Sequence, residues 1–206
     1  MEGMDHRLRK SLDTVAGFYD RRKVGDVGPL GFRRSSDMAT LLACVDRLLA
    51  AGLITPGETA FLDLGCGDGR VNLFFSFLTR LSVGIECDEW TLEEYPDARN
   101  KLKTRLSRAG LIPPPQNVFL FHGDSLDDAT HGDILHKTGT GLDQFDLFYT
   151  YLVMHEEFAG LLRKKAKKDA VFMVYGLQKI MPDYEGFERL EPLSPLQGIL
   201  ALYRKI

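Results

Sequence analysis

The chain has 206 residues, of which 44% are hydrophobic and 27% are charged, and these proportions suit one domain with a substantial buried core. Lysine and arginine number 26 against 29 acidic residues, so the formal charge of -3 provides no global basic field, and we expect no nucleic acid partner. No apolar stretch is long enough to span a bilayer, and no hydrophobic region follows the N-terminal charges. We therefore expect a cytoplasmic protein without a membrane partner, either a monomer or a homodimer.

The first 36 residues are expected to form an N-terminal arm, and residues 37–206 a single domain. Within the arm, GFYDRRKVGDVGPLGFRRSS is rich in glycine, proline, arginine and aromatic residues. This composition suits a lid that becomes ordered over a bound cofactor, and it suits a plain surface arm equally. We hypothesise a lid, with Tyr19 and Phe32 as its contacts.

Alternating strand and helix patterns follow the arm. A helix capped by Ser36 or Asp37 and ended by Gly52 precedes the first strand. Nearly continuous apolar strands separated by helices predict a parallel sheet covered on both faces. The C-terminal segment 186–206 looks like a strand pair, so we expect a mostly parallel, seven-stranded α/β sheet with a C-terminal antiparallel hairpin strand. Apolar runs predict strands at 60–65, 82–87, 117–124, 144–153 and 170–176, and helical patterns cover 71–81, 90–109 and 156–168, with a short helix or a loop at 127–137.

The three cysteines do not form a recognisable framework. Cys44, Cys66 and Cys87 are an odd number without CxxC spacing, which argues against disulfides and against a zinc site. We therefore expect no bound metal. The basic run RKKAKK at 163–168 is interpreted as a solvated helix end, where cations complement the helix dipole.

A glycine-rich turn, FLDLGCGDGR at 61–70, follows the first strand of the predicted sheet. In such sheets the first strand-to-helix turn usually contacts the ligand, and glycines there allow the backbone to approach it closely. Glu86 follows about 20 residues later at the end of the second strand, where an acid commonly holds ribose hydroxyls. We therefore expect a ligand that contains a nucleoside.

The charge of the turn discriminates between nucleoside ligands. A phosphate-binding P-loop is excluded because no Gly-Lys-Ser/Thr follows the glycines, and the spacing is GxGxG rather than the GxGxxG of dinucleotide folds. Asp63 would repel a pyrophosphate but would attract the ammonium and sulfonium of S-adenosylmethionine. The carboxylate of that cofactor would use the helix N-terminus, and Asp124 after the third strand would accept from the adenine amine.

The sequence resembles the class I S-adenosylmethionine-dependent methyltransferases in the order and spacing of four motifs. These are DLGCGDGR, the acid of GIEC, HGDSL and FDLFYTYL. The resemblance covers roughly residues 35–206 and implies a Rossmann-like, doubly wound fold. It implies that the glycine turn lines the methionine end, Glu86 the ribose and Asp124 the adenine. The residues expected to bind the cofactor are Asp63, Gly65, Cys66, Gly67, Gly69, Glu86, Cys87, Asp124, Ser125 and Tyr149.

A finer resemblance concerns the acceptor. The sequence is also similar to small bacterial relatives of mitochondrial-type protein-lysine methyltransferases. The features that carry this resemblance are DLGCGDGR, a YxYL sequence in the fourth strand, a helix ending in basic residues and a YG pair closing the fifth strand. The fourth strand carries Asp146-Leu-Phe-Tyr-Thr-Tyr in place of the Asn-Pro-Pro-Tyr of base and glutamine N-methylases. This departure argues against a nucleobase or glutamine acceptor.

An amine acceptor must lose a proton before it can be methylated, and desolvation or a nearby carboxylate or tyrosine promotes that loss. Tyr149, Tyr151 and Glu156 lie at or just past the fourth strand and are the predicted catalytic residues. Tyr151 is equally consistent with simple packing, and His155 is interpreted as a helix-terminal residue in preference to a base. Trp90 either covers the adenine or packs in the core.

These observations lead to a predicted methyltransferase that uses S-adenosylmethionine and acts on an amine such as a protein lysine. A small-molecule acceptor is the alternative within the same class. A different class, an NAD-dependent oxidoreductase or a non-catalytic cofactor sensor, stays open. The sequence does not identify the acceptor.

Overall fold

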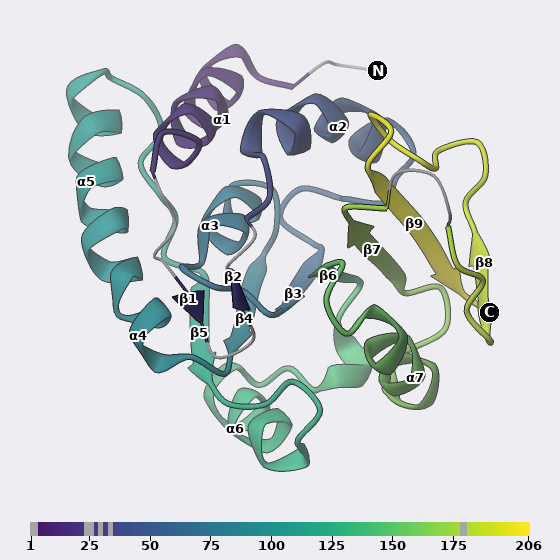
Figure 1. Cartoon of the computed structure of the whole chain (residues 1–206). Helices are drawn as coiled ribbons and strands as arrows, with labels where there is room; N and C mark the ends of the chain where they lie inside the picture. Colours follow the sequence, from purple (N-terminus) through teal and green to yellow (C-terminus); the bar gives the residue numbers. More distant parts are fainter. Residues whose placement is uncertain (1–3, 23–26, 29–30, 33–34, 178–180) are drawn as a thin grey trace.

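A seven-stranded sheet with the strand order β5-β4-β3-β6-β7-β9-β8 forms the centre of the protein in the computed structural model (Figure 1). The structure describes residues 4–22, 27–28, 31–32, 35–177 and 181–206. The strands of the sheet are β3 Ala60–Leu64, β4 Leu81–Glu86, β5 Val118–His122, β6 Leu147–Tyr151, β7 Val171–Tyr175, β8 Phe187–Arg189 and β9 Leu200–Lys205. Two short strands near the N-terminus, β1 Val27–Gly28 and β2 Gly31–Phe32, pair with each other.

The sheet is parallel from β5 to β7, and β9 runs antiparallel to both β7 and β8. This arrangement confirms the predicted mostly parallel, seven-stranded sheet with a C-terminal antiparallel strand. All five residues of β3 and all five of β7 are buried, because helices cover both faces. The nearly continuous apolar runs of the sequence follow from that double burial.

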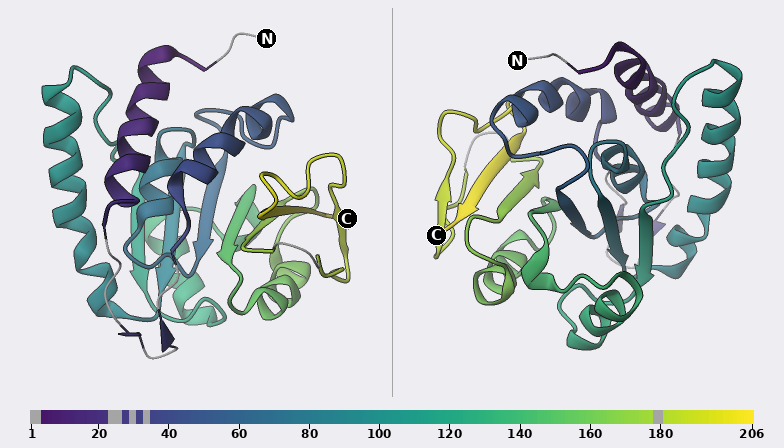
Figure 2. Two further views of the ribbon diagram at one scale, coloured as in Figure 1. Left: turned by 45° about the horizontal axis from the view of Figure 1, so that its top comes forward. Right: turned by 180° about the vertical axis from the view of Figure 1, so that it is seen from behind.

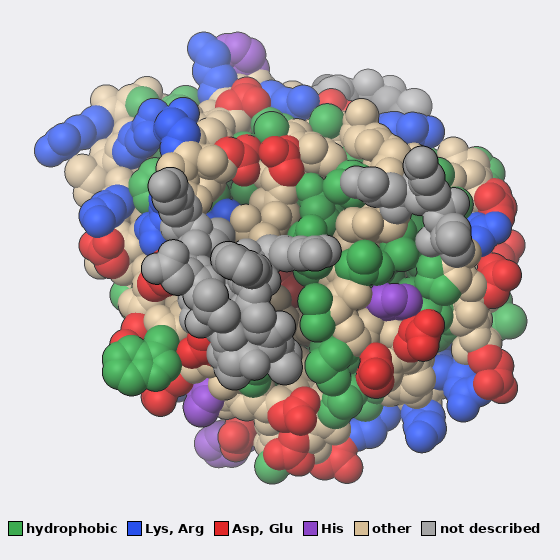
Figure 3. Space-filling view, in the orientation of Figure 1, with side chains coloured by type: hydrophobic (Ala, Val, Ile, Leu, Met, Phe, Trp, Pro, Cys, Tyr) green, Lys and Arg blue, Asp and Glu red, His purple; other side chains and the backbone are tan. Residues whose placement is uncertain are grey.

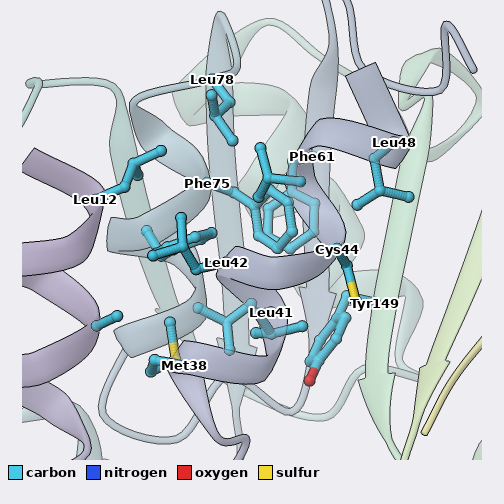
Figure 4. Packing of buried hydrophobic residues seen from close by; sticks show 14 of the residues in the cluster. Leu12, Met38, Leu41, Leu42, Cys44, Leu48, Phe61, Phe75, Leu78 and Tyr149 are labelled. Carbon is cyan, nitrogen blue, oxygen red and sulfur yellow. The ribbon is translucent and has the colours of Figure 1, made fainter. Parts of the chain in front are cut away.

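Helices lie on both sides of the sheet (Figure 2). The core is accordingly divided into two clusters, one containing buried residues of α1, α2, α3 and α5 and the other containing buried residues of α6 and α7. Figure 4 shows part of the first cluster, where Phe61 of β3 meets Phe75 of α3 and leucines of α2. The helices are α1 His6–Tyr19, α2 Met38–Ala50, α3 Arg70–Ser76, α4 Glu89–Leu92, α5 Glu94–Arg108, α6 Asp128–Thr138 and α7 His155–Lys165, with a 3-10 turn at Leu142–Gln144.

Helix α1 lies inside the segment predicted to be an arm. The Asp5 carboxylate accepts a hydrogen bond from the Leu8 backbone N–H at 2.9 Å and thereby caps the helix. Leu12 and Tyr19 on its inner face are buried in the core. Part of the predicted arm is therefore an integral helix. The lid itself stays a prediction, because residues 23–26, 29–30 and 33–34 and the side chain of Phe32 lie outside the described residues.

Two predicted helices differ from the observed ones. The helix predicted over 71–81 ends at Ser76, and strand β4 already begins at Leu81. The helix predicted over 90–109 is divided into α4 and α5, and the short α4 is capped by Asp88, whose side chain accepts from the Trp90 N–H. In the part of the chain that the structure describes, no helix is both long and apolar enough to cross a membrane.

Candidate functional site

A cavity of about 560 Å³ lies at the carboxyl ends of the central strands. Strand β3 pairs with β4 on one side and with β6 on the other, so the strand order reverses here, where α/β sheets bind their ligands. The lining residues come from the carboxyl ends of β3, β4 and β6, from the loops and first helical turns that follow β3, β4, β5 and β6, and from the residues just before α2. They include Ser35, Ser36, Asp63, Leu64, Gly65, Cys66, Gly67, Asp68, Arg70, Glu86, Cys87, Asp88, Thr91, Asp124, Ser125, Tyr149, Thr150, Tyr151, Leu152, Val153, Met154 and Phe158.

The three glycines of the turn after β3 have two different roles. Gly65 and Gly67 line the cavity with φ of 132° and 54°, and a Cβ on Gly65 would meet no atom within 4 Å. The backbone at Gly65 therefore leaves open space. Gly69 is absent from the lining, and a Cβ there would lie 2.7 Å from Leu120 Cδ1 and 2.8 Å from Tyr95 Cδ2. Gly69 is thus needed for packing, whereas the first two glycines leave the loop backbone accessible.

Asp63 is a buried carboxyl group in the wall of the cavity, with 1% of its surface exposed. Its Oδ1 has no hydrogen-bond partner among the described atoms. Burial, and secondarily the charge of Glu86, raise the pKa of Asp63 well above the usual value for an aspartate. A ligand cation beside Asp63 would favour the ionised carboxylate and supply the missing partner.

Glu86 connects the two loops that follow β3 and β4. Its Oε2 accepts from the Gly67 N–H at 2.9 Å, and its Oε1 accepts from the Asp88 N–H at 3.0 Å. The Cys87 thiol also donates to Oε1, at 3.3 Å, and burial followed by the charge of Glu86 raises the pKa of that thiol. The buried Cys66 thiol has a pKa well above its usual value, chiefly through burial. A raised pKa lowers the fraction of reactive thiolate at both cysteines.

The loop after β5 contributes Asp124 and Ser125 to the cavity. The Asp124 side chain accepts from the Leu126 backbone N–H at 2.8 Å, which fixes its orientation. Trp90 differs from both interpretations of the sequence, because its side chain is 79% exposed and it is absent from the cavity lining. It is neither a core residue nor a cover for the cavity.

The wall formed by β6 and the start of α7 is largely aromatic and apolar. Tyr149 is 2% exposed, and its hydroxyl shares a hydrogen bond with the Ser36 hydroxyl. Figure 4 shows this hydroxyl pointing away from the cluster around Phe61 and Phe75. Burial raises the pKa of Tyr149 well above that of an ordinary tyrosine, so the phenol keeps its proton. Tyr151 packs against Tyr175 with the ring centroids 5.4 Å apart.

The structure brings ten of the predicted site residues together around the cavity. They are Asp63, Gly65, Cys66, Gly67, Glu86, Cys87, Asp124, Ser125, Tyr149 and Tyr151. Gly69 and Glu156 lie outside the lining, and Glu156 is exposed in the first turn of α7. His155 is the first residue of α7, and its Nδ1 lies 2.6 Å from the Tyr184 hydroxyl.

Several lining residues were not predicted. Asp68 and Arg70 belong to the glycine turn itself and form a buried ion pair, with Arg70 Nε 2.9 Å from Asp68 Oδ1. Their charges in an otherwise glycine-rich turn were a usable signal. Ser36 reaches the cavity only because α2 packs across the sheet, and nothing in the local sequence indicates that position. Within the described residues there is no cluster of His, Cys, Asp and Glu suited to a metal ion.

Comparison with known proteins gives structural likeness only. No protein-family model matches the sequence, and no curated protein matches it. The fold is similar to that of an RNA methyltransferase from Salinibacter ruber, solved with S-adenosyl-L-homocysteine, at 16% identity and a TM-score of 0.52 over 84% of this chain and 94% of that one. It is also similar to the putative methyltransferase yhhF from Escherichia coli, at 15% identity and a TM-score of 0.50 over 89% and 90% of the two chains.

At these identities the comparison establishes architecture. This chain has the strand order β5-β4-β3-β6-β7-β9-β8, the antiparallel strand β9 and a cavity at the point where the order reverses. The finer resemblance to lysine methyltransferases stays a prediction. The chain has the Rossmann-like fold of the class I methyltransferases.

Proposed function

We propose that the protein is an S-adenosylmethionine-dependent methyltransferase whose acceptor is an amine such as a protein lysine. The observation that carries the proposal is the buried carboxyl of Asp63, which lines the cavity beside the open backbone of Gly65 and whose Oδ1 has no hydrogen-bond partner among the described atoms. A buried polar atom without a partner costs free energy unless a ligand satisfies it. A cationic ligand that reaches Asp63 would supply this partner.

The residues of the cavity fit this cofactor. Asp63 would hold the ammonium, Glu86 the ribose hydroxyls and Asp124 the adenine amine, which are the assignments that the sequence predicts. When bound, S-adenosylmethionine would supply a methyl group on a sulfonium: an N–C bond forms to an amine nitrogen with a free electron pair, and the C–S bond breaks with its electrons going to the neutral thioether. The chain itself then has to orient the acceptor, exclude water and accept a proton from the amine.

The acceptor would meet the aromatic wall formed by β6 and α7. Tyr149 keeps its proton because its pKa is raised, so it acts as a hydrogen-bonding and positioning group in this proposal. Tyr151 and Phe158 line the same wall and provide the apolar surroundings that lower the pKa of an entering amine. Glu156, exposed at the start of α7, remains the candidate that takes the released proton to solvent.

The charge of the visible surface favours a cationic acceptor. On the face seen in Figure 3, hydrophobic side chains gather toward the centre and acidic side chains border them, whereas most lysines and arginines lie near the edge. A polyanion would be repelled from such a border, and an alkylammonium with an apolar stem would be attracted.

RNA is the second candidate acceptor. The Salinibacter ruber neighbour is an RNA methyltransferase. In this chain α5 carries five cations and no acid after Asp97, with which Lys101 forms an ion pair, and a concentration of cations on one helix is a feature of surfaces that bind phosphate backbones. These cations are Arg99, Lys101, Lys103, Arg105 and Arg108.

Isothermal titration tests the cofactor. The protein is titrated with S-adenosylmethionine, S-adenosylhomocysteine and NAD, and the titrations are repeated on Asp63→Ala and Glu86→Ala. We expect both adenosyl ligands to bind, NAD to fail, and both variants to lose at least about tenfold in affinity. Asp133→Ala, an exposed acid on α6, is the matched control and should bind as the wild type does. Binding of NAD alone would refute the proposal.

Radiolabelled methyl transfer to a cell extract tests the acceptor. The labelled products are treated with protease or with ribonuclease before separation. Label that only protease releases, and that amino-acid analysis places on lysine, supports the amine proposal. Label that ribonuclease releases would replace it with the RNA acceptor, and label in the small-molecule fraction would replace it with a metabolite.

A further inference from the structure

The cavity contains a single cation among its described lining residues. That cation is Arg70, the first residue of α3. The acidic residues in the same lining outnumber it, and they are Asp63, Asp68, Glu86, Asp88 and Asp124. An anionic group on a ligand would therefore be repelled by most of the wall and attracted at one point.

Arg70 is buried and held in a defined orientation. Its Nε and Nη2 donate to Oδ1 and Oδ2 of Asp68 at 2.9 and 3.0 Å, and the two side chains are only 6% and 2% exposed. The ring of Tyr19, itself fully buried in α1, lies against the guanidinium with 5.3 Å between Cζ and the ring centroid. A buried charge is costly unless it is paired, and this pair together with the aromatic face compensates Arg70.

Asp63 and Arg70 flank the glycine turn 65–69 in the sequence, and both line the cavity. An amino-acid group carries an ammonium and a carboxylate on the same carbon, so a ligand whose ammonium reaches Asp63 places a carboxylate close by. Helix α3 has only seven residues, and its N-cap, Gly69, has no side chain. The backbone N–H groups of so short a helix are a weak anion site by themselves, and the adjacent guanidinium supplies the missing charge.

We propose that Arg70 is the specificity-determining residue that binds the carboxylate of the amino-acid end of the ligand. Asp68 and Tyr19 are positioning residues that act through Arg70. The inference rests on the proposed function, because it takes S-adenosylmethionine as the ligand. It also gives α1 a role in the site, since the helix contributes the ring that supports the guanidinium.

The guanidinium geometry makes the inference specific. A planar guanidinium donates two hydrogen bonds to the Asp68 carboxylate along one edge and has further N–H donors for a second carboxylate. A lysine ammonium cannot present its donors in this planar, forked arrangement. Arg70→Lys should therefore retain part of the attraction but lose the orientation. Arg70→Gln should lose the charge entirely.

Titration with three ligands of graded structure tests the inference. S-adenosylhomocysteine carries both the ammonium and the carboxylate, decarboxylated S-adenosylmethionine carries the ammonium without the carboxylate, and 5′-methylthioadenosine carries neither. We expect Arg70→Gln to weaken S-adenosylhomocysteine by roughly 10- to 100-fold. The other two ligands should change less than about threefold, because they lack the group that Arg70 binds. Arg80→Gln, an exposed arginine outside the cavity, is the matched control.

The affinity ratio of S-adenosylhomocysteine to 5′-methylthioadenosine is compared within each variant, so a reduced folded fraction does not affect it. A ratio in Arg70→Gln equal to that of the wild type overturns the inference while the proposed function stands. If Arg70→Gln does not fold, Arg70→Lys decides, and an unchanged ratio there overturns the inference as well. Wild-type protein that binds none of the three ligands refutes the proposed function itself.

Tyr19 gives an independent readout. Tyr19→Leu removes the aromatic face, and Tyr19→Phe keeps it. We expect the ligand ratio to fall in Tyr19→Leu and to stay near the wild-type value in Tyr19→Phe, since only the ring supports Arg70. Equal ratios in both variants would show that α1 has no positioning role.

Discussion

The hydroxyl of Tyr149 and the hydroxyl of Ser36 share a buried hydrogen bond, although the residues are 113 positions apart in the chain. Tyr149 belongs to β6, and Ser36 directly precedes the N-cap of α2. The neighbouring Tyr175 hydroxyl accepts from the Asp37 backbone N–H at 3.0 Å. The carboxyl ends of β6 and β7 thus fix the point where the chain enters α2, beside the cavity.

Removal of either hydroxyl of this pair should destabilise the protein. Tyr149→Phe leaves the Ser36 hydroxyl buried without its partner, and Ser36→Ala does the same to Tyr149, so each variant should lose about 1 to 2 kcal/mol of unfolding free energy. The double variant should lose less than the sum of the two, because the second substitution removes a group already unpaired. Urea denaturation measures all three values, and strict additivity would contradict direct coupling.

A variant of the same pair tests whether Tyr149 positions the acceptor or takes part in acid–base chemistry. Because the pKa of Tyr149 is raised, loss of the phenol should lower the rate of methyl transfer without moving the pH dependence of kcat/KM. The measurement is a pH–rate profile of Tyr149→Phe against wild type. A displaced acidic or basic limb would restore Tyr149 as a proton acceptor.

The centre of the sheet was predictable because its strands are buried on both faces. The VFMVY run of β7 and the AFLDL run of β3 are buried at every position, and such runs are recognisable without tertiary information. Helix α1 was missed although Leu12, Val15, Ala16 and Tyr19 recur at the spacing of a helix face. The expected arm was based on the composition of residues 17–36, which overlap only the last turn of this helix.

The candidate site was predictable where each residue ends a strand. Asp63, Glu86 and Asp124 lie in β3 or just at the ends of β4 and β5, and parallel strands bring those ends to one edge of the sheet. Ser36 depends on the packing of α2, which no local pattern encodes. Glu156 was expected at the cavity because it is close to β6 in sequence, but the first turn of α7 directs it to solvent.

The glycines of the turn should respond differently to alanine. Gly69→Ala forces a left-handed backbone on alanine and drives its Cβ against Leu120 and Tyr95, so we expect a loss of about 2 to 4 kcal/mol in unfolding free energy. Gly67→Ala meets only Thr91 Cγ2 at 3.9 Å and should cost about 1 kcal/mol. Among folded molecules, Gly67→Ala should weaken cofactor binding more than Gly69→Ala does, because Gly67 lines the cavity and Gly69 does not. Thermal unfolding and titration together check both orders, and equal losses would contradict the assignment of separate roles.

Asp63→Asn should stabilise the ligand-free protein increasingly as the pH rises. The folded-state pKa of Asp63 lies above that of an unfolded aspartate, so wild-type stability is complete below the ordinary value of 3.8 and decreases as the pH approaches the folded pKa. The asparagine variant lacks this loss, which amounts to at most about 1.4 kcal/mol per pH unit. Denaturant unfolding at several pH values measures the difference. Parallel stability curves for wild type and variant would contradict a raised pKa.

Cofactor binding should release a proton from Asp63. In the absence of a ligand, burial favours the protonated carboxyl, whereas an ammonium beside it favours the carboxylate, so the pKa falls on binding and the proton leaves. Titration of S-adenosylhomocysteine in buffers of different ionisation enthalpy, at pH values of about 5 to 7, counts the released protons. Asp63→Asn should show no such release, and neither should wild-type protein titrated with 5′-methylthioadenosine, which lacks the ammonium. A binding enthalpy of S-adenosylhomocysteine independent of the buffer would mean that Asp63 does not receive the cation, and the orientation of the ligand in the cavity would have to be reversed.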